Sequence, residues 1–156
     1  MFKPGRVAAM AVTLVMPFAA WAQGSGVAGR WIVDFNRTMR NENGVMTAGD
    51  PARARITFEQ RGDSVLGTWV LLSPMEDPMP PARQLKGVIA SGAVRVVSDP
   101  SPARVRDESG EREIKIITTY EFKVDGDALT GTSQSRPLDG GDGPPPRPFA
   151  AKREKP

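Results

Sequence analysis

Hydrophobic and polar residues alternate along two related segments of the chain. The first reads ITFEQRGDSVLGT over residues 56–68, and the second reads YEFKVDGDALTGT over residues 120–132. Successive side chains of a strand point to opposite faces, so this alternation is typical of strands that are buried on one side. In each segment Gly62 or Gly126 precedes an aspartate, where a tight hairpin loop needs a left-handed residue that glycine adopts without strain. The two segments therefore predict two β-hairpins.

Further stretches of alternation lie on both sides of these hairpins. The segments between them have no regular period: residues 37–52 and 99–112 are polar and contain proline, and residues 73–82 and 137–146 are rich in proline or glycine. Because proline cannot donate to a sheet ladder and breaks helices, we expect four long connections there. The strands are predicted at residues 29–35, 53–60, 64–71, 84–90, 93–98, 113–124, 128–135 and 147–153.

Eight sequential antiparallel strands send their connections to alternate ends of a sheet. The links after the second, fourth and sixth strands are short, so one end is closed by tight turns, and the long connections form a rim at the other end. An open sheet would leave two unpaired edges, which favour aggregation. We therefore expect an all-β fold, an eight-stranded antiparallel up-and-down β-barrel. A barrel of this size is either filled by side chains or holds one small ligand.

The first 22 residues have the pattern of a cleaved secretory signal peptide. Lys3 and Arg6 precede an apolar run, which ends at Ala20-Trp21-Ala22, a small-residue cleavage site. The run is too short for a hydrocarbon core of about 30 Å, so a membrane-spanning helix is not expected. We expect a periplasmic or secreted protein that leaves the membrane after cleavage. The predicted parts are a signal peptide at residues 1–22, a flexible lead-in at residues 23–28, the barrel at residues 29–153 and a tail at residues 154–156.

Charge and missing residue types narrow the function classes. The net charge of +3 falls to +1 without Lys3 and Arg6, and no basic block precedes the tail, so nucleic acid is not an expected partner. The chain has no cysteine and no histidine. It therefore has no disulfide, and it lacks the commonest general base and the commonest transition-metal ligand. We expect no metal and no cofactor, and a binding protein rather than an enzyme.

Several short motifs resemble those of a known group of barrels. Gly29-Arg30-Trp31, the two Gly-Asp hairpins and the terminal PFAAKR are similar to small secreted bacterial barrels of the lipocalin-like type, in the calycin group that includes lipocalins and avidins. In lipocalins the tryptophan of the first strand packs at the closed end against a basic residue from the last strand. The resemblance implies that Trp31 and Arg153 form this contact. Where lipocalins have a helix before the last strand, this chain has the Gly/Pro-rich residues 137–146.

The inward positions of the predicted strands carry most of the aromatic residues. These side chains either fill a packed core or line an apolar pocket, and the sequence leaves both interpretations open. Phe58 and Phe122 lie near the tight turns, so we expect them to pack in the core. If the inward residues line a pocket, its upper wall near the rim is apolar, and the Tyr120 hydroxyl is its polar group. The candidate ligand-binding residues are Trp69, Leu71, Met75 and Tyr120.

The expected function is a small, monomeric binding module. Its partner would be a small apolar ligand at the barrel mouth or a periplasmic protein on the Pro-rich rim, since loops on a rigid scaffold commonly carry function. One alternative is a hydrolase or isomerase that uses rim carboxylates. Another is an inhibitor or accessory protein that inserts a rim loop into a partner. The carboxylates considered for catalysis are Glu76, Asp77, Glu108 and Glu111.

Overall fold

The computed structural model describes residues 26–40 and 46–156, and these residues form strands, turns and loops without a helix. In this described part, therefore, no helix has the length and apolar character needed to cross a membrane. The all-β prediction is confirmed. The predicted signal peptide lies outside the described residues. The strands are β1 (Gly29–Arg40), β2 (Met46–Arg61), β3 (Ser64–Ser73), β4 (Arg83–Ala90), β5 (Ala93–Ser98), β6 (Ser101–Asp107), β7 (Gly110–Asp125), β8 (Ala128–Pro137) and β9 (Arg147–Arg153).

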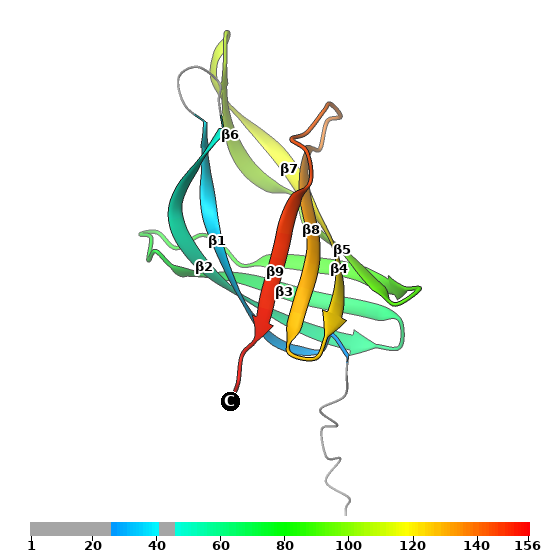
Figure 1. Cartoon of the computed structure of the whole chain (residues 1–156). Coiled ribbons are helices and arrows are strands. Elements are labelled where there is room, and N and C mark those ends of the chain that lie inside the picture. Colours follow the sequence, from blue (N-terminus) through cyan, green and yellow to red (C-terminus); the bar gives the residue numbers. More distant parts are fainter. Residues whose placement is uncertain (1–25, 41–45) are drawn as a thin grey trace, which may run out of the picture.

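The strands form one antiparallel sheet that closes on itself (Figure 1). The order is β5-β4-β3-β2-β1-β9-β8-β7-β6, and an additional pairing between β5 and β7 closes the ring. β6 pairs only with β7 and stands outside this ring, so the barrel has eight strands. The predicted up-and-down barrel is confirmed, including its last strand at residues 147–153.

The prediction of a long connection was wrong for two of the four segments. Residues 37–52 mostly continue β1 and β2, and residues 99–112 contain β6 and the start of β7. Both pairs of strands extend past the barrel as two-stranded ribbons, and Figure 1 shows the β6–β7 ribbon rising above it. Most described side chains of these ribbons are exposed or half-buried. Such ribbons need no apolar alternation and tolerate proline, which is why their sequences resembled loops.

The turns at the closed end follow the prediction. β2–β3, β4–β5 and β7–β8 are joined by two-residue turns, and Gly62, Gly92 and Gly126 have φ angles of 60°, 75° and 57°. These are left-handed values, which favour glycine because it has no Cβ to clash. The loops at residues 74–82 and 138–146 lie at the opposite end, as expected.

The closed end is sealed by a contact between the first and last strands. The Arg153 guanidinium lies 4.2 Å from the centre of the fully buried Trp31 ring, as expected from the resemblance to lipocalin-like barrels. Trp31 Nε1 donates to the Val27 carbonyl oxygen at 2.8 Å, and Arg153 donates to the Ala28 and Gly26 carbonyl oxygens at 2.8 and 3.0 Å. Residues 26–28 were expected to be a flexible lead-in, yet Val27 is only 1% exposed because its side chain joins the core.

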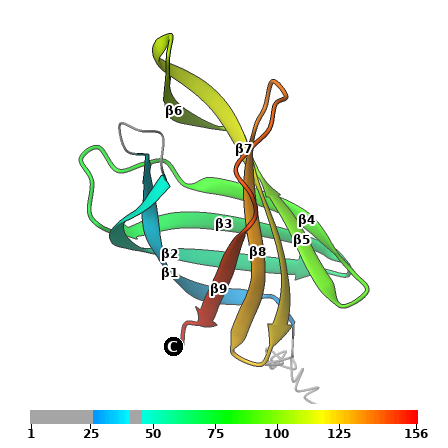
Figure 2. The ribbon, with the colours of Figure 1, turned by 45° about the horizontal axis from the view of Figure 1, so that its top comes forward.

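The seam between β1 and β9 is short. β1 is in register with β9 only at Trp31 and Ile32, and the Glu154 N–H donates to the Arg30 carbonyl oxygen at 2.8 Å just below. Toward the rim the two strands diverge, as Figure 2 shows. Beyond Ile32, β1 pairs with β2 alone, and most of β9 pairs with β8 alone. The backbone hydrogen-bond ladder between β1 and β9 is therefore absent on this side near the mouth.

Candidate functional site

The barrel interior has a packed half and a hollow half. Near the tight turns it is filled by an apolar core, in which the Phe58 and Phe122 rings are 5.6 Å apart and both are 2% exposed. This placement agrees with the expectation that they serve packing. Toward the rim lies a cavity of about 870 Å³. Both interpretations of the inward aromatic residues thus apply, each to one half of the barrel.

Aromatic rings from four strands form one side of this cavity. The Trp69 and Tyr120 rings stack with centroids 5.8 Å apart and an angle of 24° between their planes. Phe35 meets Trp69 edge-on at 5.8 Å, and Phe149 lies 5.1 Å from Tyr120. Because β1, β3, β7 and β9 each supply one ring, closure of the barrel is what brings them together. A continuous aromatic surface of this kind suits a flat apolar molecule.

A group of hydroxyl side chains lines another part of the cavity. Thr118, Ser133 and Ser135 come from β7 and β8, and the Thr118 and Ser135 hydroxyl oxygens are 2.9 Å apart. Behind them, the Ser98 hydroxyl accepts a hydrogen bond from the Thr118 N–H at 2.9 Å. These groups give the cavity several positions for hydrogen bonds beside its apolar surface.

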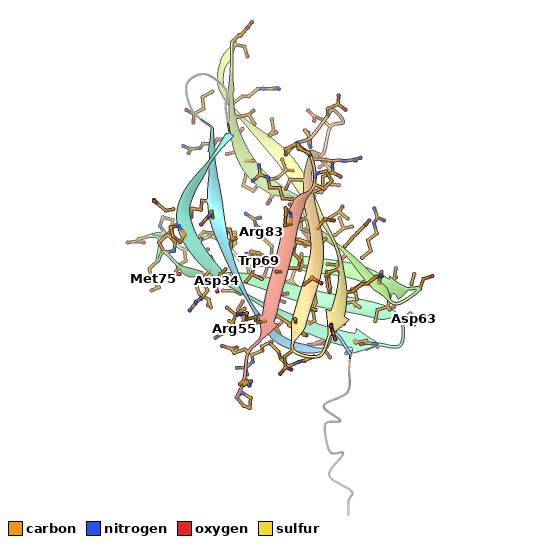
Figure 3. The ribbon with its side chains drawn as sticks, viewed as in Figure 1. Asp34, Arg55, Asp63, Trp69, Met75 and Arg83 are labelled. Atoms are coloured by element: carbon orange, nitrogen blue, oxygen red, sulfur yellow. The ribbon has the colours of Figure 1, made fainter. Side chains whose placement is uncertain are left out.

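Two arginines also lie at inward-facing strand positions. Arg83 is directly opposite Trp69 in the β3–β4 register, and Arg147 is directly opposite Ser133 in the β8–β9 register. Directly opposed residues of antiparallel strands point to the same face, so both side chains face the cavity, and both line it. Figure 3 labels Arg83 close to Trp69, and Arg83 is exposed to solvent. The cavity therefore combines an aromatic surface with positive charge.

Tyr120 lies in an apolar environment that also has a positive charge nearby. Its side chain is only 7% exposed, and burial raises the pKa of its phenol from 10.0 to about 12, while the nearby Arg83 charge acts in the opposite direction. Burial dominates because the ionised phenolate would lose its hydration. Tyr120 consequently remains a neutral hydrogen-bonding group at all ordinary pH values.

The structure brings together three of the four predicted ligand-binding residues. Trp69, Leu71 and Tyr120 line the cavity. Met75 does not line it, and its side chain is 83% exposed at the outer edge of the molecule in Figure 3. β3 ends at Ser73, and the loop that follows no longer alternates between inside and outside. The alternation of the strand therefore does not predict the direction of the Met75 side chain.

Sequence reasoning missed the two cavity arginines, although a signal was present. Arg83 lies two residues before the buried Leu85, and Arg147 lies two residues before the buried Phe149. Positions two apart in a strand share a face, so both arginines had inward parity. The predicted strand began at Gln84, so Arg83 fell outside it, and Arg147 was the first residue of the last predicted strand and was not assigned a role.

The rim carboxylates are not gathered in the cavity. Of the four acids considered for catalysis, Glu76 lines it, and Glu76 forms an ion pair with Arg37 that ties the 74–82 loop to β1. Glu111 lies on the β6–β7 ribbon and pairs with Arg104 at 3.6 Å. In the described residues no cluster of three or more acidic, cysteine or histidine side chains is placed to hold a metal ion.

The sequence matches no known protein-family model, and no curated protein matches it at a significant level. The resemblance to lipocalin-like barrels stays a prediction that rests on the short motifs above.

Proposed function

We propose that this is an exported binding protein that takes a small ligand with an apolar body into the cavity at the barrel mouth. The main support for this proposal is the cavity of about 870 Å³, one side of which is the Trp69–Tyr120 stack. Its volume lies in the range of pockets that enclose a small organic molecule, roughly 300 to 1,000 Å³. An eight-stranded barrel is also just wide enough to hold one small ligand.

The position of the cavity supports ligand entry. It lies at the end that carries the loops and ribbons, where β1 and β9 are no longer paired with each other. Residues 33–37 of β1 and 147–150 of β9 border it on the two sides of this unpaired stretch. A ligand can therefore reach the aromatic surface without disturbing the core at the closed end.

A second candidate is a protein partner on the rim. The observation that favours it is the exposure of apolar side chains on the two rim loops, 83% for Met75, 43% for Met79 and 51% for Leu138. Methionine-rich surfaces commonly bind other proteins. A hydrolase or isomerase is less well supported. It needs carboxylates that are available in one cleft, and the two that line the cavity, Asp34 and Glu76, each form an ion pair with an arginine.

Binding of phenylnaphthylamine, a neutral apolar fluorescent probe, tests the proposal. We expect saturable binding of one probe per protein, with energy transfer from a tryptophan to the probe. Trp69→Phe should remove most of this transfer, whereas Trp31→Phe, at the sealed end, should leave it largely intact. Absence of saturable binding to the folded protein, or equal effects of both variants, would contradict a ligand site at the mouth.

A further inference from the structure

The charges of the cavity are unbalanced. Three arginines line it, compared with two acids. The arginines are Arg37, Arg83 and Arg147, and the acids are Asp34 and Glu76. Both acids already have partners, because Asp34 is bonded to Arg53 at 2.6 Å and Glu76 to Arg37. In the part of the chain that the structure describes, Arg83 pairs with no carboxylate. A positive charge thus remains beside the aromatic surface.

Arg83 differs from the arginines on the outer wall of the barrel. Arg55 makes two hydrogen bonds to the Glu154 carboxylate, at 2.8 and 2.6 Å, and Arg95 pairs with Glu121 at 3.1 Å. Arg83 instead shares the inner face with Trp69, directly opposite in the register. A guanidinium that faces a cavity and has no acidic partner is suited to bind an anion, because its N–H groups form strong charge-assisted hydrogen bonds with carboxylate, sulfonate or phosphate oxygens.

The hydroxyl groups add donors on the same inner face. Thr118 and Ser135 line the cavity, and the Ser101 hydroxyl has no hydrogen-bond partner in the described residues, although its side chain is buried. Ser101 does not itself line the cavity, although Ile116, directly opposite it in the register, does. An anionic group near Arg83 would be within a surface that already provides hydrogen-bond donors.

We infer that the ligand is a small organic anion, whose flat apolar body lies along the Trp69–Tyr120 stack and whose acidic group binds Arg83. This inference rests on the proposed ligand-binding function and names the class of ligand. Both parts of the molecule have a contact in this arrangement, because Arg83 is directly opposite Trp69 in the register and Trp69 stacks with Tyr120. A neutral apolar compound would contact the aromatic surface without using the Arg83 guanidinium.

The test compares two probes that differ by one acidic group. Anilinonaphthalene sulfonate carries a sulfonate, and phenylnaphthylamine has the same aromatic body without it. We expect titration calorimetry to give tighter binding of the sulfonate, weakening as salt is raised. Arg83→Gln should weaken sulfonate binding about tenfold and leave the neutral probe nearly unaffected, since a hydrogen bond to a charged group is worth about that factor. Arg83→Lys should restore part of the difference.

Arg95→Gln is the matched control, because Arg95 is also an exposed strand arginine but does not line the cavity and pairs with Glu121. It should change neither affinity. Equal binding of both probes by the unmodified protein, or equal weakening of both by Arg83→Gln, would overturn the inference while leaving the proposed function in place. Failure of both probes to bind would overturn both. If Arg83→Gln does not fold, the salt dependence and the preference between probes in the unmodified protein decide the question.

Discussion

Tyr120 provides a direct test of how the interior is arranged, because it is the only tyrosine in the chain. The perturbation is its ionisation at high pH. Burial raises the pKa of this phenol from 10.0 to about 12 in the folded protein, against a smaller opposing effect of the Arg83 charge. Since no other tyrosine absorbs, the tyrosinate signal reports on this one side chain.

The pKa shift also has a consequence for stability. In the unfolded chain the phenol loses its proton near its ordinary pKa of 10.0, whereas in the folded state it keeps the proton until about pH 12. The contribution of Tyr120 is therefore fully present below the lower value and is lost as the pH rises through the higher one. A shift of about two pKa units corresponds to roughly 2 to 3 kcal/mol of unfolding free energy.

The assay follows near-ultraviolet tyrosinate absorbance with increasing pH, with circular dichroism recorded in parallel to confirm that the barrel is intact. We expect the absorbance midpoint well above 10. Tyr120→Phe is the matched control: it should show no tyrosinate signal, and its stability should fall less steeply in this pH range. Arg83→Gln should move the midpoint upward, because it removes the cation that favours the phenolate.

A midpoint near the ordinary value of 10.0 in the intact barrel would refute the burial of Tyr120 between the core and the cavity. A downward movement of the midpoint in Arg83→Gln would refute the placement of Arg83 beside it. The two results are independent, since the first depends on exclusion of water and the second on one charge.

Three further outcomes are expected from the structure. Trp31→Ala should lower the free energy of unfolding by about 3 to 5 kcal/mol in urea titrations, because Trp31 is fully buried; a loss below about 1 kcal/mol would remove it from the core. Gly131→Ala should destabilise the protein far more than Gly67→Ala, since the new Cβ would collide with the backbone at Glu121, whereas at Gly67 it meets a movable aromatic ring; similar melting temperatures of the two variants would contradict this. Deleting residues 74–81 should leave the melting temperature nearly unchanged and weaken probe binding, and a collapsed fold would show that the loop is structural.

The sequence by itself indicated the eight strands of the ring and the barrel, but not the extension of β1 and β2 or the strand β6. Alternation assigned Trp69 and Tyr120 to the inner face, and the Gly-Asp pairs placed Gly62 and Gly126 in tight turns at one end. These features are local, because the period of two and the left-handed turn are properties of neighbouring residues. The closed end and the inward direction of the aromatic side chains could therefore be predicted, whereas the sequence left open whether those side chains fill a core or line a cavity.

Only the tertiary structure decided where the polar part of the site lies. Arg83 had the right parity, but its place beside Tyr120 depends on closure of the ring through β5 and β7, which joins segments far apart in the sequence. The short seam between β1 and β9 and the strand character of residues 99–112 likewise follow from how strands meet. Local alternation specifies which way a side chain points, whereas the registers between strands specify which side chains meet at the same depth.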